Sequence, residues 1–196
     1  KNSSRAADEA LRSDPDNPEL RILLARGLLG AGDIRRAEPE IRHLLKTYPR
    51  SAAAQSLAGS MYLTQRDLPS ARKAFEQALR LDMDHREALA QLVNVYAETN
   101  NLGEAHRIIE RRLAKTPTDT GLLILAARTY ATGRDFSNAE RILKKVIAQD
   151  STNISAFGML GEIYISERRL EAARLEYEKL VAKDPTSIAA NTSCAT

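Results

Sequence analysis

A strict 34-residue spacing constrains this chain more than any other feature of its sequence. One alanine recurs at that interval, and a large apolar residue stands nine positions before it and four positions after it. The three rows are Ala37, Ala71, Ala105, Ala139 and Ala173; Leu28, Tyr62, Tyr96, Tyr130 and Tyr164; and Ile41, Phe75, Ile109, Leu143 and Tyr177. Each period holds two stretches with apolar residues at helical spacing, separated by a short polar turn. The pattern predicts repeated helix pairs that bury their apolar faces against one another.

The residues at these positions resemble the motif of the tetratricopeptide repeat family. A 34-residue period of helix, turn and helix is typical of that family. Its large first anchor is present as Leu89, Leu123 and Phe157, although Arg21 and Gln55 depart from it. The family's Leu-Gly pair stands whole at 160–161, and its closing proline stands at Pro49, Pro117 and Pro185. The pentatricopeptide repeat, a related family that reads RNA, usually runs one residue longer, and the constant step argues against it.

The resemblance implies an all-α fold, an α-solenoid of antiparallel helix hairpins wound into a right-handed superhelix. The spacing predicts five complete repeats, and the remaining residues at either side fit parts of two more. The complete repeats are 18–51, 52–85, 86–119, 120–153 and 154–187; residues 1–17 fit the second helix of a truncated repeat, and 188–196 fit the start of a further one. We therefore expect a fragment of a longer array, whose uncovered ends could associate end to end.

Local signals place the turns within the repeats. Gly30 and Gly32 allow a sharp turn, and Asp33 after them is a candidate N-cap for the second helix of its repeat. The same position carries Asp67, Asn101 and Asp135 in later repeats. Pro39 lies past the first turn of a predicted helix, where it removes a backbone donor, and we expect a bend or a late helix start there.

Composition and motifs argue against several classes of function. The net charge is +3, from 29 basic and 26 acidic residues, so nucleic acid is not the expected partner. The longest apolar run, 121–127, is far shorter than the roughly 20 residues that span a bilayer. The three histidines occupy different repeat positions without cysteine partners, which makes a metal site improbable. No serine or carboxylate is tied to a histidine by the repeat geometry, so we expect neither catalytic residues nor a cofactor, and the sequence assigns no compartment.

In the family, the face of each first helix that points away from its own hairpin lines the inner, concave groove that binds peptides. The resemblance carries that role, by register, to a set of apolar and polar positions: Ile22, Arg26, Leu57, Ser60, Gln91, Asn94, Ile124, Leu125, Arg128, Met159 and Glu162. The Lys and Asn clamp of the chaperone-binding members is absent from the first three repeats. The asparagine ladder of the sugar-transferase relatives is reduced to Asn94.

These positions lead to a functional hypothesis and its alternatives. We expect a non-catalytic scaffold that binds a peptide or helical segment of a partner protein by means of an apolar floor and a few directed hydrogen bonds. The simpler interpretation is that some of the apolar residues only contact the next repeat. The alternative function is a substrate-recruiting segment of a larger enzyme, or of an envelope or secretion assembly protein. RNA binding is a weaker third hypothesis, which a steep salt dependence would support.

Overall fold

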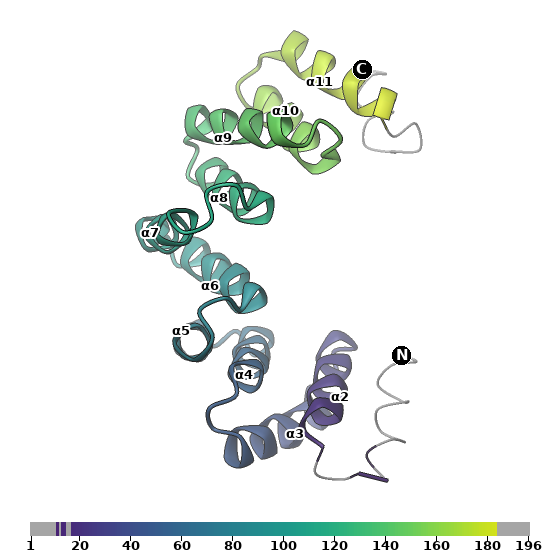
Figure 1. Cartoon of the computed structure of the whole chain (residues 1–196), viewed down its shortest axis with the longest axis vertical. Coiled ribbons are helices and arrows are strands. Elements are labelled where there is room, and N and C mark those ends of the chain that lie inside the picture. The colour runs from purple at the N-terminus through teal and green to yellow at the C-terminus, as the bar shows by residue number, and fades with distance from the viewer. Residues whose placement is uncertain (1–10, 12, 15–16, 184–196) are drawn as a thin grey trace. The chain divides into compact units, whose positions relative to one another are not determined.

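The computed structural model describes residues 11, 13–14 and 17–183, and this part of the chain contains ten α-helices and no β-strand (Figure 1). The all-α prediction is confirmed. The helices are α2 (Pro18–Gly30), α3 (Ile34–Thr47), α4 (Ala52–Thr64), α5 (Leu68–Leu81), α6 (Arg86–Glu98), α7 (Leu102–Leu113), α8 (Thr120–Thr132), α9 (Phe136–Gln149), α10 (Ile154–Ser166) and α11 (Leu170–Lys183). Most of the predicted segment 1–17, and all of 188–196, lie outside the described residues.

The chain divides into two compact units, residues 1–100 and 101–196, which we call the N-unit and the C-unit. In the N-unit, α2 pairs with α3 and α4 with α5, while α3 packs on α4 and α5 on α6. In the C-unit, α8 pairs with α9 and α10 with α11, while α7 packs on α8 and α9 on α10. Each unit is therefore built from stacked helix hairpins. The division falls inside the third predicted repeat, 86–119, and the repeat boundaries stay predictions.

The recurring alanines lie inside this packing, as their spacing predicts. Ala37, Ala71, Ala105 and Ala139 are fully buried, and Ala173 is 3% exposed. A methyl group at these positions leaves little space for anything larger, and overpacking of a close-packed interior costs about 1–3 kcal/mol. Three aromatic residues of the segment 154–187, Phe157, Tyr164 and Tyr177, are also buried.

Two glycines of first helices lie directly against aromatic rings of the second helices. A Cβ atom on Gly59 would lie 2.5 Å from the ring of Phe75, and one on Gly161 would lie 2.6 Å from the ring of Tyr177. Real Cβ atoms do not approach other atoms that closely. The hairpin of α8 and α9 has alanine, Ala127, at the glycine position and the aliphatic Leu143 at the aromatic one. The first helix therefore carries a smaller residue wherever the second carries a ring.

The turns between paired helices follow one geometry. The Asp33, Asp67 and Asp135 side chains each accept a hydrogen bond from the backbone N–H three residues later, as predicted. Asn101 makes no such bond, so that part of the prediction is wrong. Backbone φ is positive, between 54° and 75°, at one turn residue in every period: Gly32, Arg66, Asn100, Arg134 and Arg168.

Pro39 does not delay its helix. Helix α3 begins at Ile34, which corresponds by the 34-residue step to the first residues of α5 and α9. Pro39 lies inside the helix, where its missing N–H removes one hydrogen bond. The expectation of a late start is therefore wrong.

Candidate functional site

The predicted groove residues fall into three groups by exposure. Leu57 and Leu125 are only 3% and 7% exposed, so both contribute to the core. The half-buried members are Ile22, Ser60, Gln91, Asn94, Ile124 and Met159, and the exposed members are Arg26, Arg128 and Glu162.

In the C-unit, three of the predicted residues meet around one cavity of about 640 Å³, which we call the inner cavity. Arg128 comes from α8, and Met159 and Glu162 come from α10. Ala131, at a groove position of the same repeat, also lines the cavity. Sequence reasoning missed the other contributors: Thr132, Arg134, Phe136, Ile163 and Ser166. Arg134 and Phe136 lie in the turn and at the start of α9, outside the helix face from which the prediction was drawn. The recurrence of arginine at the turn position, as Arg66, Arg134 and Arg168, is the signal that would have found Arg134.

The inner cavity combines an apolar lining with charged groups. Met159 and the Phe136 ring supply the accessible apolar surface, since Ile163 is only 3% exposed. The Arg134 guanidinium lies 5.9 Å from the centre of the Phe136 ring. Within the described part of the chain, neither Arg128 nor Glu162 makes an ion pair within 4.0 Å, and both side chains are exposed. The site therefore offers two arginines and one carboxylate beside an apolar surface, which suits an apolar side chain flanked by polar groups.

The N-unit has a cavity at the equivalent positions, two repeats earlier. It measures about 560 Å³ and is lined by Leu63, Thr64, Arg66, Leu68 and Glu98. On the predicted inner face of this unit, however, Arg26 of α2 donates to Glu87 of α6 at 3.3 Å. The residue two repeats before Arg128 is Ser60, and Arg26, one repeat earlier in the same row and outside the cavity lining, is already paired.

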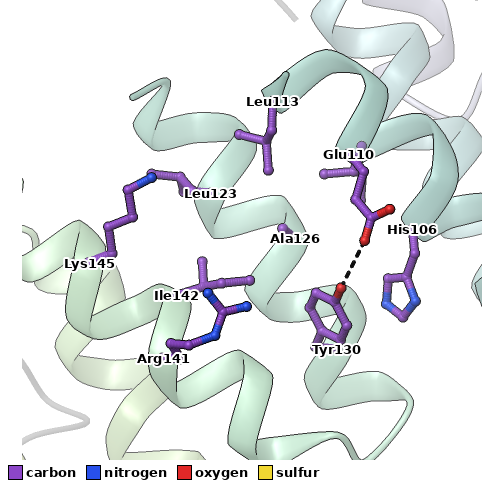
Figure 2. A pocket seen from close by; sticks show the side chains of 10 residues that line it. His106, Glu110, Leu113, Leu123, Ala126, Tyr130, Arg141, Ile142 and Lys145 are labelled. Atoms are coloured by element: carbon purple, nitrogen blue, oxygen red, sulfur yellow. Dashed lines mark hydrogen bonds between the residues drawn. The ribbon is translucent and has the colours of Figure 1, made fainter. Parts of the chain in front are cut away.

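A second cavity in the C-unit, of about 190 Å³, lies among α7, α8 and α9 (Figure 2). We call it the ring cavity. Ile109, Leu113, Leu123, Ala126 and Ile142 form its apolar part, and His106, Glu110, Tyr130, Arg141 and Lys145 form its polar part. None of these residues was predicted to bind a ligand, because repeat register marks only the inner face.

The polar part of the ring cavity is organised around Tyr130. Its hydroxyl donates to a Glu110 carboxylate oxygen at 3.2 Å, and the His106 ring stacks on the tyrosine ring at 4.1 Å between centres (Figure 2). Burial raises the pKa of the Tyr130 hydroxyl, and the charge of Glu110 adds to that effect. Tyr130 therefore remains a neutral donor at physiological pH. Arg141 donates to the Asn138 amide oxygen and Lys145 to the Pro117 carbonyl oxygen, so both cations have neutral partners.

The described residues contain neither a metal-binding cluster nor a membrane-spanning helix. No cluster of three or more His, Cys, Asp or Glu side chains in 11, 13–14 and 17–183 is arranged to hold a metal ion. Within the same residues, no helix combines the length and the apolar character needed to cross a membrane.

Stacked antiparallel helix hairpins of constant length, whose first helices carry cavity-lining residues, define a helical-repeat protein. Models of the tetratricopeptide repeat match residues 22–85 in one case and residues 62–129 and 132–195 in another. The chain belongs to the tetratricopeptide repeat family. Proteins of this family generally act as non-catalytic scaffolds that bind protein partners.

Two relatives show how such repeats occur in proteins of different size. The chain is 32% identical over 84 residues to the TPR repeat-containing protein PA0015 of Pseudomonas aeruginosa, covering 43% of this chain and 80% of that protein. It is 32% identical over 109 residues to the probable biofilm formation methyltransferase WspC of Pseudomonas putida, covering 56% of this chain and 26% of that protein. The match therefore spans about a quarter of the methyltransferase.

Solved structures of low sequence identity share the fold. YrrB, described as a TPR protein with an unusual peptide-binding site, superposes with a TM-score of 0.62 at 21% identity, over 98% of this chain and all of YrrB. PilW, described as a widely conserved type IV pilus biogenesis factor, gives a TM-score of 0.72 at 21% identity, over 87% of this chain and 79% of PilW. At this identity, the likeness concerns the fold alone.

Proposed function

We propose that the chain is a non-catalytic scaffold that binds a peptide segment of a partner protein at the inner cavity of the C-unit. The observation that carries this proposal is the meeting of Arg128, Met159 and Glu162, chosen from register alone, around one cavity of about 640 Å³. The peptide places an apolar side chain against Met159 and the Phe136 ring. Polar groups on either side of that anchor pair with Arg128 and Glu162.

Charge and exposure support this arrangement. Arg128 and Glu162 are exposed and make no ion pair within 4.0 Å inside the described ranges, so a guest binds without breaking an internal pair there. Their opposite signs give the site a polarity, because an acidic side chain of the guest is attracted to Arg128 and a basic one to Glu162. Electrostatic complementarity of this kind fixes the direction and register of a bound segment.

The experiment begins by selecting ligands from a random peptide library displayed on phage, with the purified chain as bait. Selected peptides are synthesised with a fluorescent label, and their affinities are measured by anisotropy. Arg128→Glu is expected to weaken binding about tenfold or more, equivalent to about 1.4 kcal/mol. Arg128→Lys is expected to retain most of the affinity.

Arg111→Glu is the matched control, because Arg111 is an exposed arginine on α7 outside the inner cavity. It makes the same change in net charge and is expected to leave affinity unchanged. If Arg128→Glu and Arg111→Glu weaken peptide binding equally, the effect comes from net charge and the proposal is overturned. Selected peptides whose binding is insensitive to Arg128→Glu and to Glu162→Lys would place the site elsewhere.

A second candidate function is recruitment within a larger protein. The match to part of the methyltransferase WspC favours a segment that delivers a substrate to an attached enzyme. The other form of recruitment is within an envelope or secretion assembly protein. In both cases the inner cavity is the docking element. The reading frame that surrounds the chain distinguishes these roles from a separate scaffold.

A further inference from the structure

The ring cavity exists because one small residue stands where most repeats have a leucine. Ala126 of α8 occupies the position that Leu24, Leu92 and Leu160 fill in α2, α6 and α10, and all three leucines are buried. Helix α4 also has alanine there, Ala58, which lies inside the hydrophobic cluster of α2, α3 and α4. Ala126 lines the ring cavity together with side chains from α7 and α9.

The size and lining of the ring cavity match one six-membered ring. An engineered apolar cavity of about 150 Å³ is large enough to hold benzene. The ring cavity measures about 190 Å³, and its walls are Ile109, Leu113, Leu123, Ala126 and Ile142. Tyr130 adds an aromatic surface beside this space, and aromatic pairs gain about 0.5–1.5 kcal/mol beyond the area that they bury.

The polar groups around the opening favour an anion. Arg141 and Lys145, from one face of α9, both line the cavity (Figure 2). Their side chains donate to the neutral oxygens of Asn138 and Pro117. Glu110 is the one carboxylate in the lining, and it already accepts from Tyr130. Asp135, the N-cap of α9, bonds to Asn138. The buried Nε2 atom of His106 has no hydrogen-bond partner within the described residues, so the site has polar capacity that the chain itself does not use.

We propose that the ring cavity binds a single aromatic ring that carries a carboxylate on a short linker. The ring lies against Ala126 and the apolar walls, and the carboxylate pairs with Arg141 and Lys145 at the opening. Charge-assisted hydrogen bonds to arginine and lysine are about twice as strong as neutral ones, and they give this site its preference for the acid. The site is separate from the inner cavity, so it adds a second ligand to the proposed scaffold function.

The test uses 3-phenylpropionate as the probe, with saturation-transfer NMR to detect binding and a shift titration to measure it. Two analogues separate the contributions: 3-phenylpropionamide lacks the charge, and propionate lacks the ring. We expect binding of the phenyl acid, about tenfold weaker binding of the amide, and none of propionate. A tripeptide with a C-terminal phenylalanine and a free carboxylate carries the same chemistry. Its affinity relative to the free acid shows whether the source is a protein terminus or a small molecule.

Variants of the cavity connect binding to its residues. Ala126→Leu restores the residue found in three other first helices and is expected to abolish binding by filling the space. The double variant Arg141→Gln with Lys145→Gln is expected to weaken binding of the phenyl acid to the affinity of the amide. Both of these residues are exposed, so this variant remains informative if Ala126→Leu reduces stability.

Lys73→Gln is the matched control, because Lys73 is the N-unit residue two repeats before Arg141. Neither it nor Arg128→Glu in the inner cavity is expected to change binding of the phenyl acid. The proposal is overturned if no probe binds at millimolar concentration, if acid and amide bind equally, or if a folded Ala126→Leu variant binds as the native chain does. Loss of peptide binding at the inner cavity has no effect on these readouts, so the two proposals fail separately.

Discussion

The N-unit and the C-unit share their hairpin packing and differ in what their inner faces leave unpaired. Each has a cavity at equivalent positions, lined by an arginine in a left-handed turn, Arg66 in one and Arg134 in the other. In the N-unit, Arg26 is paired with Glu87 across the first helices. In the C-unit, the arginine of the same row, Arg128, has no ion pair within 4.0 Å inside the described ranges. Fold and binding capacity are therefore set by different residues of the same repeat.

The largest expected effect tests whether the packing of the two units is equivalent. Ala71→Leu in the N-unit and Ala139→Leu in the C-unit each place a branched side chain at a fully buried position. Both are expected to lower the free energy of unfolding by about 2–3 kcal/mol. Urea denaturation followed by circular dichroism measures the change, with Ala148→Leu on the exposed side of α9 as the control. Tolerance at only one of the two sites would break the equivalence.

The next effect concerns the glycines that face aromatic rings. Gly59→Ala and Gly161→Ala are expected to cost about 1–2 kcal/mol each, because the added carbon lies within 2.6 Å of a ring atom. Replacing the ring should recover part of the loss, so Gly59→Ala with Phe75→Leu reproduces the combination that Ala127 and Leu143 make in α8 and α9. Melting of the single and double variants gives the coupling energy. Additive losses would show that the ring and the glycine are not matched.

A charge network is found in the C-unit around Glu140. Burial opposes ionisation, but hydrogen bonds from Arg169, Lys144 and Tyr164 outweigh it and lower the pKa of Glu140 from 4.5 to about 2. A carboxylate with a lowered pKa contributes stability above its unfolded pKa, and that contribution is lost as the pH falls through the folded value.

Glu140→Gln is therefore expected to cost about 1–3 kcal/mol at neutral pH and progressively less between pH 4.5 and pH 2. Unfolding free energies of the variant and the native chain across that range give the difference. Because the Glu140 side chain is 17% exposed, solvent screening leaves much of the effect in place. If the difference in unfolding free energy does not change with pH, the Glu140 network does not distinguish the C-unit from the N-unit.

The smallest effect sharpens the comparison directly. Glu87→Gln breaks the pair with Arg26, whose side chains are 54% and 43% exposed, so stability is expected to change by less than about 1 kcal/mol. The same variant releases Arg26 and should allow acidic peptides to bind the N-unit, measured by anisotropy with Arg26→Gln as the control. If binding to the N-unit does not increase, the shape of the inner face, and not the pairing state of its arginine, separates the units.

The sequence predicts those features that depend on contacts inside one repeat. The alanine row and the aspartate caps recur because each is set by neighbouring residues of the same hairpin. The sequence does not predict which residues of the groove face are buried. Leu23 is 42% exposed, whereas Leu57, at the same repeat position, is buried. That difference arises from the neighbouring helices. The ring cavity depends on Ala126 together with side chains from α7 and α9, so no single repeat contains the information that locates it.

The left-handed turns have an electrostatic consequence. Arg66, Arg134 and Arg168 follow the ends of α4, α8 and α10, where the partial negative charge of a helix C-terminus attracts a cation by about 0.3–1 kcal/mol at low ionic strength. A residue with a Cβ atom loses about 1–2 kcal/mol in this backbone conformation. Dissolved salt screens the attraction and leaves the steric cost unchanged. At the three turns that carry arginine, the balance between these two terms therefore depends on ionic strength.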